Sequence, residues 1–88
     1  MKIKDSYILR NVAGQNLVVG LGNDVNFNAA ITLNETAAFI WNCMLSDTTV
    51  DAVAECLVKE YDVDKNTALK DVEAFADKLR KNGIIDEQ

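Results

Sequence analysis

Apolar and polar residues alternate through the first third of the chain, and this period predicts β-strands. The segments YILRNVA (residues 7–13) and NLVVGLG (residues 16–22) are rich in aliphatic and β-branched residues. Gly14 and Gln15 lie between them, and glycine supplies the positive φ that a tight hairpin turn requires. A further turn at GND leads into VNFNAAITL, which again alternates. We therefore expect three short antiparallel strands.

The period of the apolar residues changes at Asn34. Before it, every second residue from Val25 to Ile31 falls on one face, as in a strand. After it, apolar residues recur at helical spacing. Asn34 is a suitable N-cap, because its side chain can accept a hydrogen bond from an unpaired N–H of the first turn. The pattern predicts a helix from about Glu35 to Leu45.

Two more helices follow, each with a polar cap and an apolar stripe. The second begins near Thr48 and Thr49, and its stripe is Val50, Val53, Ala54, Leu57, Val58 and Tyr61. The third begins after Asp64, and its stripe is Ala68, Leu69, Val72, Phe75, Ala76 and Leu79. Gly83 follows the last turn, where a left-handed glycine commonly ends a helix. No proline interrupts these helices.

The order βββααα predicts a small α+β domain in which helices cover one side of a three-stranded antiparallel sheet. Such a sheet has edge strands, and an unprotected edge can pair with another chain. The segment from Val25 to Ile31 carries no charge and no proline. We expect it to attract a partner strand.

Composition and charge narrow the functional classes. The 88 residues fit one domain, with 49% hydrophobic and 26% charged residues. The formal charge of −5 disfavours binding to nucleic acid. No apolar run is long enough for a membrane span, and the first residues do not resemble a signal peptide. A cytoplasmic location is expected.

The residue types needed for catalysis or metal binding are scarce. Histidine, the commonest general base, is absent. The two cysteines, Cys43 and Cys56, do not fit a CxxC or zinc spacing, and we interpret both as small apolar residues of helical stripes. Trp41 and Phe75 could line a ligand pocket, but their spacing favours a place in the core. No enzyme activity, metal or cofactor is expected.

Three segments resemble the PqqD family, which is named for its role in pyrroloquinoline quinone biosynthesis. They are ITLNETAAFIW, TTVDAVAECLVKEYDVD and DVEAFADKLRKNGII, in the family's order and over nearly the whole chain. The matching positions are Leu33, Asn34, Ile40, Trp41, Thr49, Glu60, Tyr61, Asp71, Val72, Phe75, Leu79 and Gly83. Ala30 and Ala38 depart from the glycines that many relatives carry.

The resemblance implies a winged helix-turn-helix-like domain that serves as a recognition element for ribosomally made precursor peptides. In that family the peptide's leader adds a strand between the third strand and the third helix, and a modifying enzyme, often a radical SAM enzyme, docks nearby. The expected peptide-binding residues are Val25, Asn26, Phe27, Asn28, Ala29, Ala30, Ile31, Asp71, Val72, Phe75, Lys78, Leu79 and Asn82. Val72, Phe75 and Leu79 are equally compatible with ordinary core positions.

Two other classes of function stay open at this point. Winged helices commonly bind DNA, so a transcriptional regulator is the main alternative. The basic residues of the third helix are interspersed with Asp71, Glu73 and Asp77, which argues against a basic stripe. A scaffold or small enzyme subunit without a peptide role is the third class. Homodimer formation is left open by the sequence.

Overall fold

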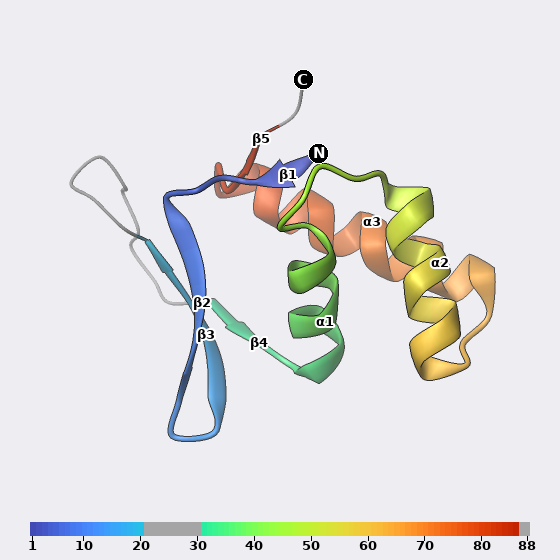
Figure 1. Ribbon diagram of the computed structural model, residues 1–88, viewed down its shortest axis with the longest axis horizontal. Coiled ribbons are helices and arrows are strands. Elements are labelled where there is room, and N and C mark those ends of the chain that lie inside the picture. The colour runs from blue at the N-terminus through green and yellow to red at the C-terminus, as the bar shows by residue number, and fades with distance from the viewer. Residues whose placement is uncertain (21–30, 87–88) are drawn as a thin grey trace.

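The computed structural model describes residues 1–20 and 31–86. In this part of the chain a three-stranded antiparallel sheet is followed by three helices, and a two-stranded sheet joins the chain's ends (Figure 1). The elements are β1 Lys2–Ile3, β2 Tyr7–Val12, β3 Gln15–Gly20, β4 Ile31–Leu33, α1 Glu35–Cys43, α2 Val50–Tyr61, α3 Lys65–Lys81 and β5 Ile85–Asp86. The predicted α+β class is confirmed.

The β2–β3 hairpin turns one residue earlier than the sequence predicts. Val12 pairs with Gln15, so the two-residue turn consists of Ala13 and Gly14. Both turn residues have positive φ, 52° and 81° respectively. Two positive φ values match the right-handed twist of the flanking strands. Glycine adopts this conformation freely, whereas alanine does so at a cost.

The strand β4 lies at an edge of the larger sheet. The strand order is β2, β3, β4, and Val18 of β3 pairs with Ile31 of β4. Among the described strands, only β3 pairs with β4. Ile31 is therefore the described end of the predicted third strand, and the predicted positions Val25 to Ala30 lie outside the described residues.

The three predicted N-caps are confirmed. The side chain of Asn34 accepts a hydrogen bond from the N–H of Ala37 over 2.8 Å, and Thr49 accepts one from Ala52 over 3.1 Å. Asp64 caps α3 in the same way. Each cap satisfies an N–H that the helix leaves unpaired. The helix α1 ends at Cys43 rather than at Leu45.

Gly83 ends α3 as predicted. Its φ is +70°, and its N–H bonds to the carbonyl oxygen of Arg80 over 3.1 Å. The N–H of Ile84 reaches the carbonyl oxygen of Leu79 over 2.9 Å, which completes a Schellman motif. The motif turns the chain out of α3 and into β5.

The core lies between the inner face of the sheet and the three helices. Trp41 and Met44 are among its largest side chains, and both are fully buried. Val72 and Leu79 of α3 are 0% exposed, and Phe75 is 8% exposed. The interpretation of both cysteines as stripe residues is half right, because Cys43 packs against the core but Cys56 is exposed. Tyr61, also assigned to a stripe, is 37% exposed.

The small β1–β5 sheet was not predicted. Ile3 pairs with Ile85, and both side chains are buried. The N-terminal amino group also contacts Asp47 over 2.9 Å, and this ammonium lowers the pKa of the exposed carboxyl group. The N-terminal segment is thus held by β5 and by the loop between α1 and α2.

Candidate functional site

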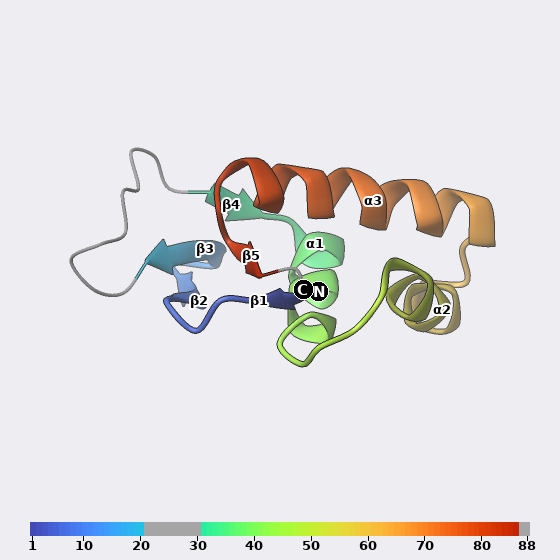
Figure 2. The ribbon, with the colours of Figure 1, turned by 90° about the horizontal axis from the view of Figure 1, so that it is seen from above.

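The free edge of β4 and the helix α3 lie on the same side of the molecule. Figure 2 shows the sheet from above, with β2, β3 and β4 in order and β4 nearest to α3. An edge strand presents the N–H and C=O groups of alternate residues away from its neighbour. Alternate residues among Ile31, Thr32 and Leu33 therefore offer their backbone groups to an added strand.

A cavity of about 320 Å³ opens between α3 and the start of α1, next to the end of β4. Its apolar lining includes the buried side chains of Ile40 and Phe75. Asn34 and Asp71 supply polar groups, and both are exposed. The remaining lining residues are Thr36, Ala37 and Ala74. The cavity is large enough for one apolar side chain, and it carries a carboxylate.

Four of the predicted α3 residues lie along one face of the helix. Asp71, Phe75, Lys78 and Asn82 follow one another at intervals of four, three and four residues, which is the spacing of neighbours on a helical face. Asp71 and Phe75 line the cavity. Lys78 and Asn82 follow on the same face toward the end of α3, and both are exposed. We call these four residues the α3 row.

The other two predicted α3 residues do not lie in this row. Val72 and Leu79 are 0% exposed, so the structure places them in the core, which was the alternative that the sequence left open. Their side chains hold α3 against the other helices. A direct contact with a ligand would require the core to open, so neither residue belongs to the accessible surface of α3.

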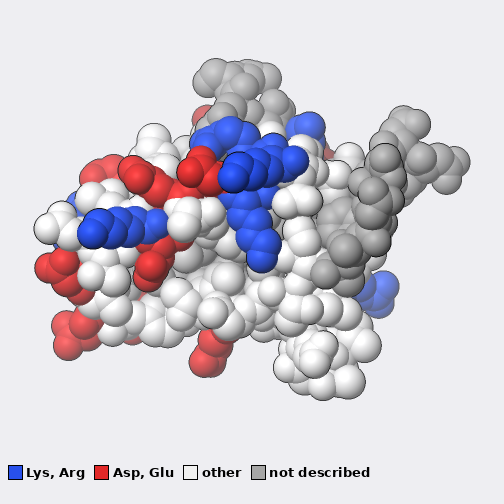
Figure 3. All heavy atoms as spheres, turned by 180° about the vertical axis from the view of Figure 1, so that it is seen from behind, with Lys and Arg blue, Asp and Glu red and all other residues white. Residues whose placement is uncertain are grey.

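The two ends of α3 differ in charge. Its last turn carries Lys78, Arg80 and Lys81. Figure 3 shows basic side chains gathered over the C-terminal half of α3, whereas most acidic side chains on this face lie toward its N-terminal end. Asp77 forms an ion pair with Arg80 within the basic region. The basic region is therefore short and interrupted, unlike a stripe that follows a nucleic-acid backbone.

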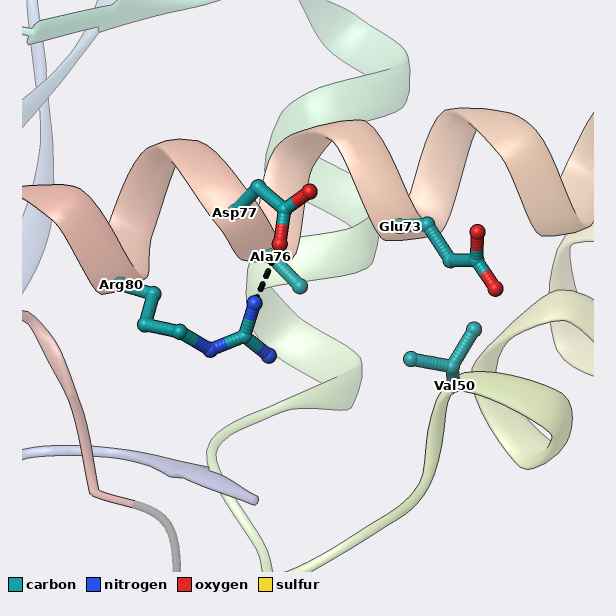
Figure 4. A pocket seen from close by; sticks show the side chains of 5 residues that line it. All are labelled: Val50, Glu73, Ala76, Asp77 and Arg80. Carbon is teal, nitrogen blue, oxygen red and sulfur yellow. Dashed lines mark hydrogen bonds and ion pairs between the residues drawn. The ribbon is translucent and has the colours of Figure 1, made fainter.

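A second hollow lies on the opposite side of α3, and sequence reasoning did not find it. It measures about 250 Å³ and lies between α3 and the first residue of α2, Val50. Figure 4 shows Glu73 and the ion-paired Asp77 and Arg80 projecting from α3 around it, with Ala76 between them. Helical spacing turns Glu73 and Arg80 about half a turn away from the α3 row.

The patterns of metal-binding clusters and of membrane-spanning helices do not occur within residues 1–20 and 31–86. This part of the chain has no group of three or more Cys, Asp or Glu side chains arranged to hold a metal ion. None of its helices has the length and the apolar character needed to cross a lipid bilayer.

A protein-family model matches most of the chain. The family model for coenzyme PQQ synthesis protein D (PqqD) matches residues 8–85. A comparison with curated protein sequences gives no match.

Two solved structures have a similar fold. The first is described as TbiB1 in complex with the TbiA(beta) leader peptide; it has 18% sequence identity and a TM-score of 0.79, and the alignment covers 100% of this chain and 98% of that one. The second is described as lasso peptide synthetase B1 complexed with the leader peptide, with 24% identity, a TM-score of 0.74, and coverage of 94% and 93%. At these identities the likeness is one of fold.

Proposed function

The chain belongs to the PqqD family, and from this premise we propose that it binds the leader segment of a ribosomally made precursor peptide without catalysing a reaction itself. The observation that carries the proposal is the edge of β4 that no described strand covers, which lies next to the cavity and the α3 row. The fold's likeness to two proteins whose structures hold leader peptides supports it.

The leader adds a strand to β4. Hydrogen bonds between the two backbones contribute affinity that depends little on the leader's sequence. Every second leader residue then faces α3, because side chains of a strand alternate between its two faces. Ile31, Thr32 and Leu33 supply the described part of this strand. The predicted positions Val25 to Ala30 belong to the same proposal.

The cavity beside Phe75 receives one apolar side chain of the leader. Burying a leucine-sized side chain contributes about 1.5–3 kcal/mol. The cavity is built by α1 and α3 together, which are held in place by core residues such as Trp41 and Val72. A pocket formed by rigid elements loses little conformational freedom when the leader binds.

The bound leader is presented to a separate modifying enzyme. The family resemblance suggests a radical SAM enzyme for this role. The surface that contacts such an enzyme must lie away from the α3 row, which the leader covers. The hollow around Glu73 and Arg80 satisfies this condition, because it lies on the other side of α3.

A random peptide library tests the proposed function and does not require the sequence of the leader. The immobilised protein is challenged with a displayed library of random 12-residue peptides, and a 20-base-pair DNA duplex at low salt serves as a second probe. We expect enrichment of extended, apolar-centred peptides and no tight binding of the duplex. Tight, salt-sensitive duplex binding without peptide enrichment would favour a DNA-binding regulator.

A further inference from the structure

We infer that the surface between β4 and α3, which we call the groove, selects leaders by the order of their charges: a basic residue, an apolar residue and an acidic residue, placed at positions i, i+2 and i+4 of the leader. The inference rests on the proposed function and adds the class of leader that this chain recognises. It is drawn from the α3 row, in which Asp71 and Phe75 line the cavity and the exposed Lys78 follows on the same face of the helix.

The spacing of the α3 row fits every second residue of a strand. Asp71 and Lys78 are seven residues apart, which is about two helical turns and about 10.5 Å along the axis. Leader residues i and i+4 are about 13 Å apart and point to the same side of the strand. The difference of about 2.5 Å is within the reach of long charged side chains. Residue i+2 then lies opposite Phe75.

Asp71 favours a basic leader residue at its end of the groove. Its side chain is exposed at the cavity, and it has no ion-pair partner within the described part of the chain. The cavity walls beside it are mostly apolar. A lysine or arginine of the leader can lay its aliphatic stem along these walls and place its charge at the carboxylate.

Lys78 favours an acidic leader residue at the other end. It is exposed, and no carboxylate of the described residues pairs with it. The nearest acid in sequence, Asp77, is already paired with Arg80. Lys81 adds a second positive charge in the same turn. An acidic leader side chain therefore meets a net positive surface here.

The fold also sets the direction in which the bound leader runs. The neighbouring strands of the larger sheet all pair antiparallel, and antiparallel pairing is slightly more stable per residue. β4 leads through Asn34 into the cavity that Asp71 lines. The N-terminal end of a leader segment that pairs antiparallel to β4 therefore lies near Asp71, and its C-terminal end lies near Lys78. Its sequence reads basic, any, apolar, any, acidic from the N-terminus.

The test compares peptides selected by three proteins from the random 12-residue library. The first is the wild type. The second carries Asp71→Lys with Lys78→Glu, which reverses the charges of the α3 row. The third carries Glu73→Lys with Arg80→Glu, which is a matched reversal at the same spacing on the opposite side of α3. Circular dichroism confirms that each variant is folded.

We expect the wild type and the Glu73/Arg80 variant to enrich the basic–x–apolar–x–acidic order. The Asp71/Lys78 variant should enrich the reverse order. Synthetic peptides of the two orders should differ in affinity for the wild type by about tenfold, since two partly exposed ion pairs contribute up to about 1.4 kcal/mol together.

Two outcomes would overturn the inference, and only the second would also contradict peptide binding. Enriched peptides without a charge order, or with the same order for all three proteins, would contradict the charge selection but leave peptide binding intact. Enrichment of no peptide by any of the three proteins would contradict the proposed function as well.

Discussion

The backbone N–H of Ile84 donates a hydrogen bond to the carbonyl oxygen of Leu79, and this bond closes α3 against the chain that leaves it. Both side chains are 0% exposed, so the closing bond lies beside an apolar contact inside the core. This hydrogen bond forms only because Gly83, the residue before Ile84, adopts a positive φ. The end of α3, where Lys78 and Asn82 lie, therefore depends on one glycine.

Gly83→Ala should lower the free energy of unfolding by about 1–2 kcal/mol, because an L-residue pays this amount in the left-handed region. A Cβ built at Gly83 meets no atom within 4 Å, so the whole loss should come from backbone strain. Urea denaturation measures it. Gly83→Asn serves as the control and should lose less, since asparagine tolerates this region better. Equal stability of all three proteins would contradict the assignment.

Ala13→Asn should raise the free energy of unfolding by about 0.5–1 kcal/mol, because Asn-Gly is the preferred pair for a turn with two positive φ values. Ala13 has a φ of 52° in the hairpin turn. Gln15→Asn is the control, because Gln15 lies in β3 and pairs with Val12. Thermal unfolding of the two variants provides the measurement. A loss of stability in Ala13→Asn would show that the turn has another geometry.

Local signals in the sequence predicted much of the fold, because caps and periodicity involve residues that are neighbours in the chain. The helix caps at Asn34, Thr49 and Gly83 are examples of such local signals. The β1–β5 sheet was missed because its strands are two residues long and come from opposite ends of the chain, so neither shows a period. The exposure of Cys56 was missed although helical spacing turns this residue about 120° away from the centre of the stripe assigned to α2.

The cavity was predicted only on its α3 side. Asp71, Phe75, Lys78 and Asn82 were identified by the family resemblance and lie along one face. Their partners across the cavity, such as Ala37 and Ile40, were not identified, because only the packing of α1 against α3 brings them together. Val72 and Leu79 were chosen from the same short segment, and sequence spacing alone did not separate groove from core.

Ala74→Phe should fill the cavity and weaken peptide binding about tenfold or more, because a leader side chain can no longer be buried there. Ala74 is exposed and lines the cavity, so the fold should tolerate the larger side chain. Ala52→Phe, at an exposed alanine of α2, is the matched control and should bind normally. Titration calorimetry with a library-selected peptide measures both. Normal binding by Ala74→Phe would remove the cavity from the site.

Cys56 should react with iodoacetamide faster than Cys43. Cys43 is partly buried, and this burial, together with the neighbouring Cys56 thiol, raises the pKa of the Cys43 thiol. A raised pKa leaves less of the reactive thiolate at neutral pH. Mass spectrometry of the digested protein gives the two rates, and denaturant should abolish the difference. Faster labelling of Cys43 in the folded protein would contradict the packing of α1 against α2.

Strand addition to β4 is the central claim, and amide hydrogen exchange tests it most directly. The exchange rates of Ile31, Thr32 and Leu33 are measured by NMR with and without a saturating library-selected peptide. An added strand should slow exchange at alternate residues of β4, either Thr32 alone or Ile31 and Leu33, because only the outward N–H groups gain partners. A peptide that binds to the protein while all three amides exchange at unchanged rates would contradict the account.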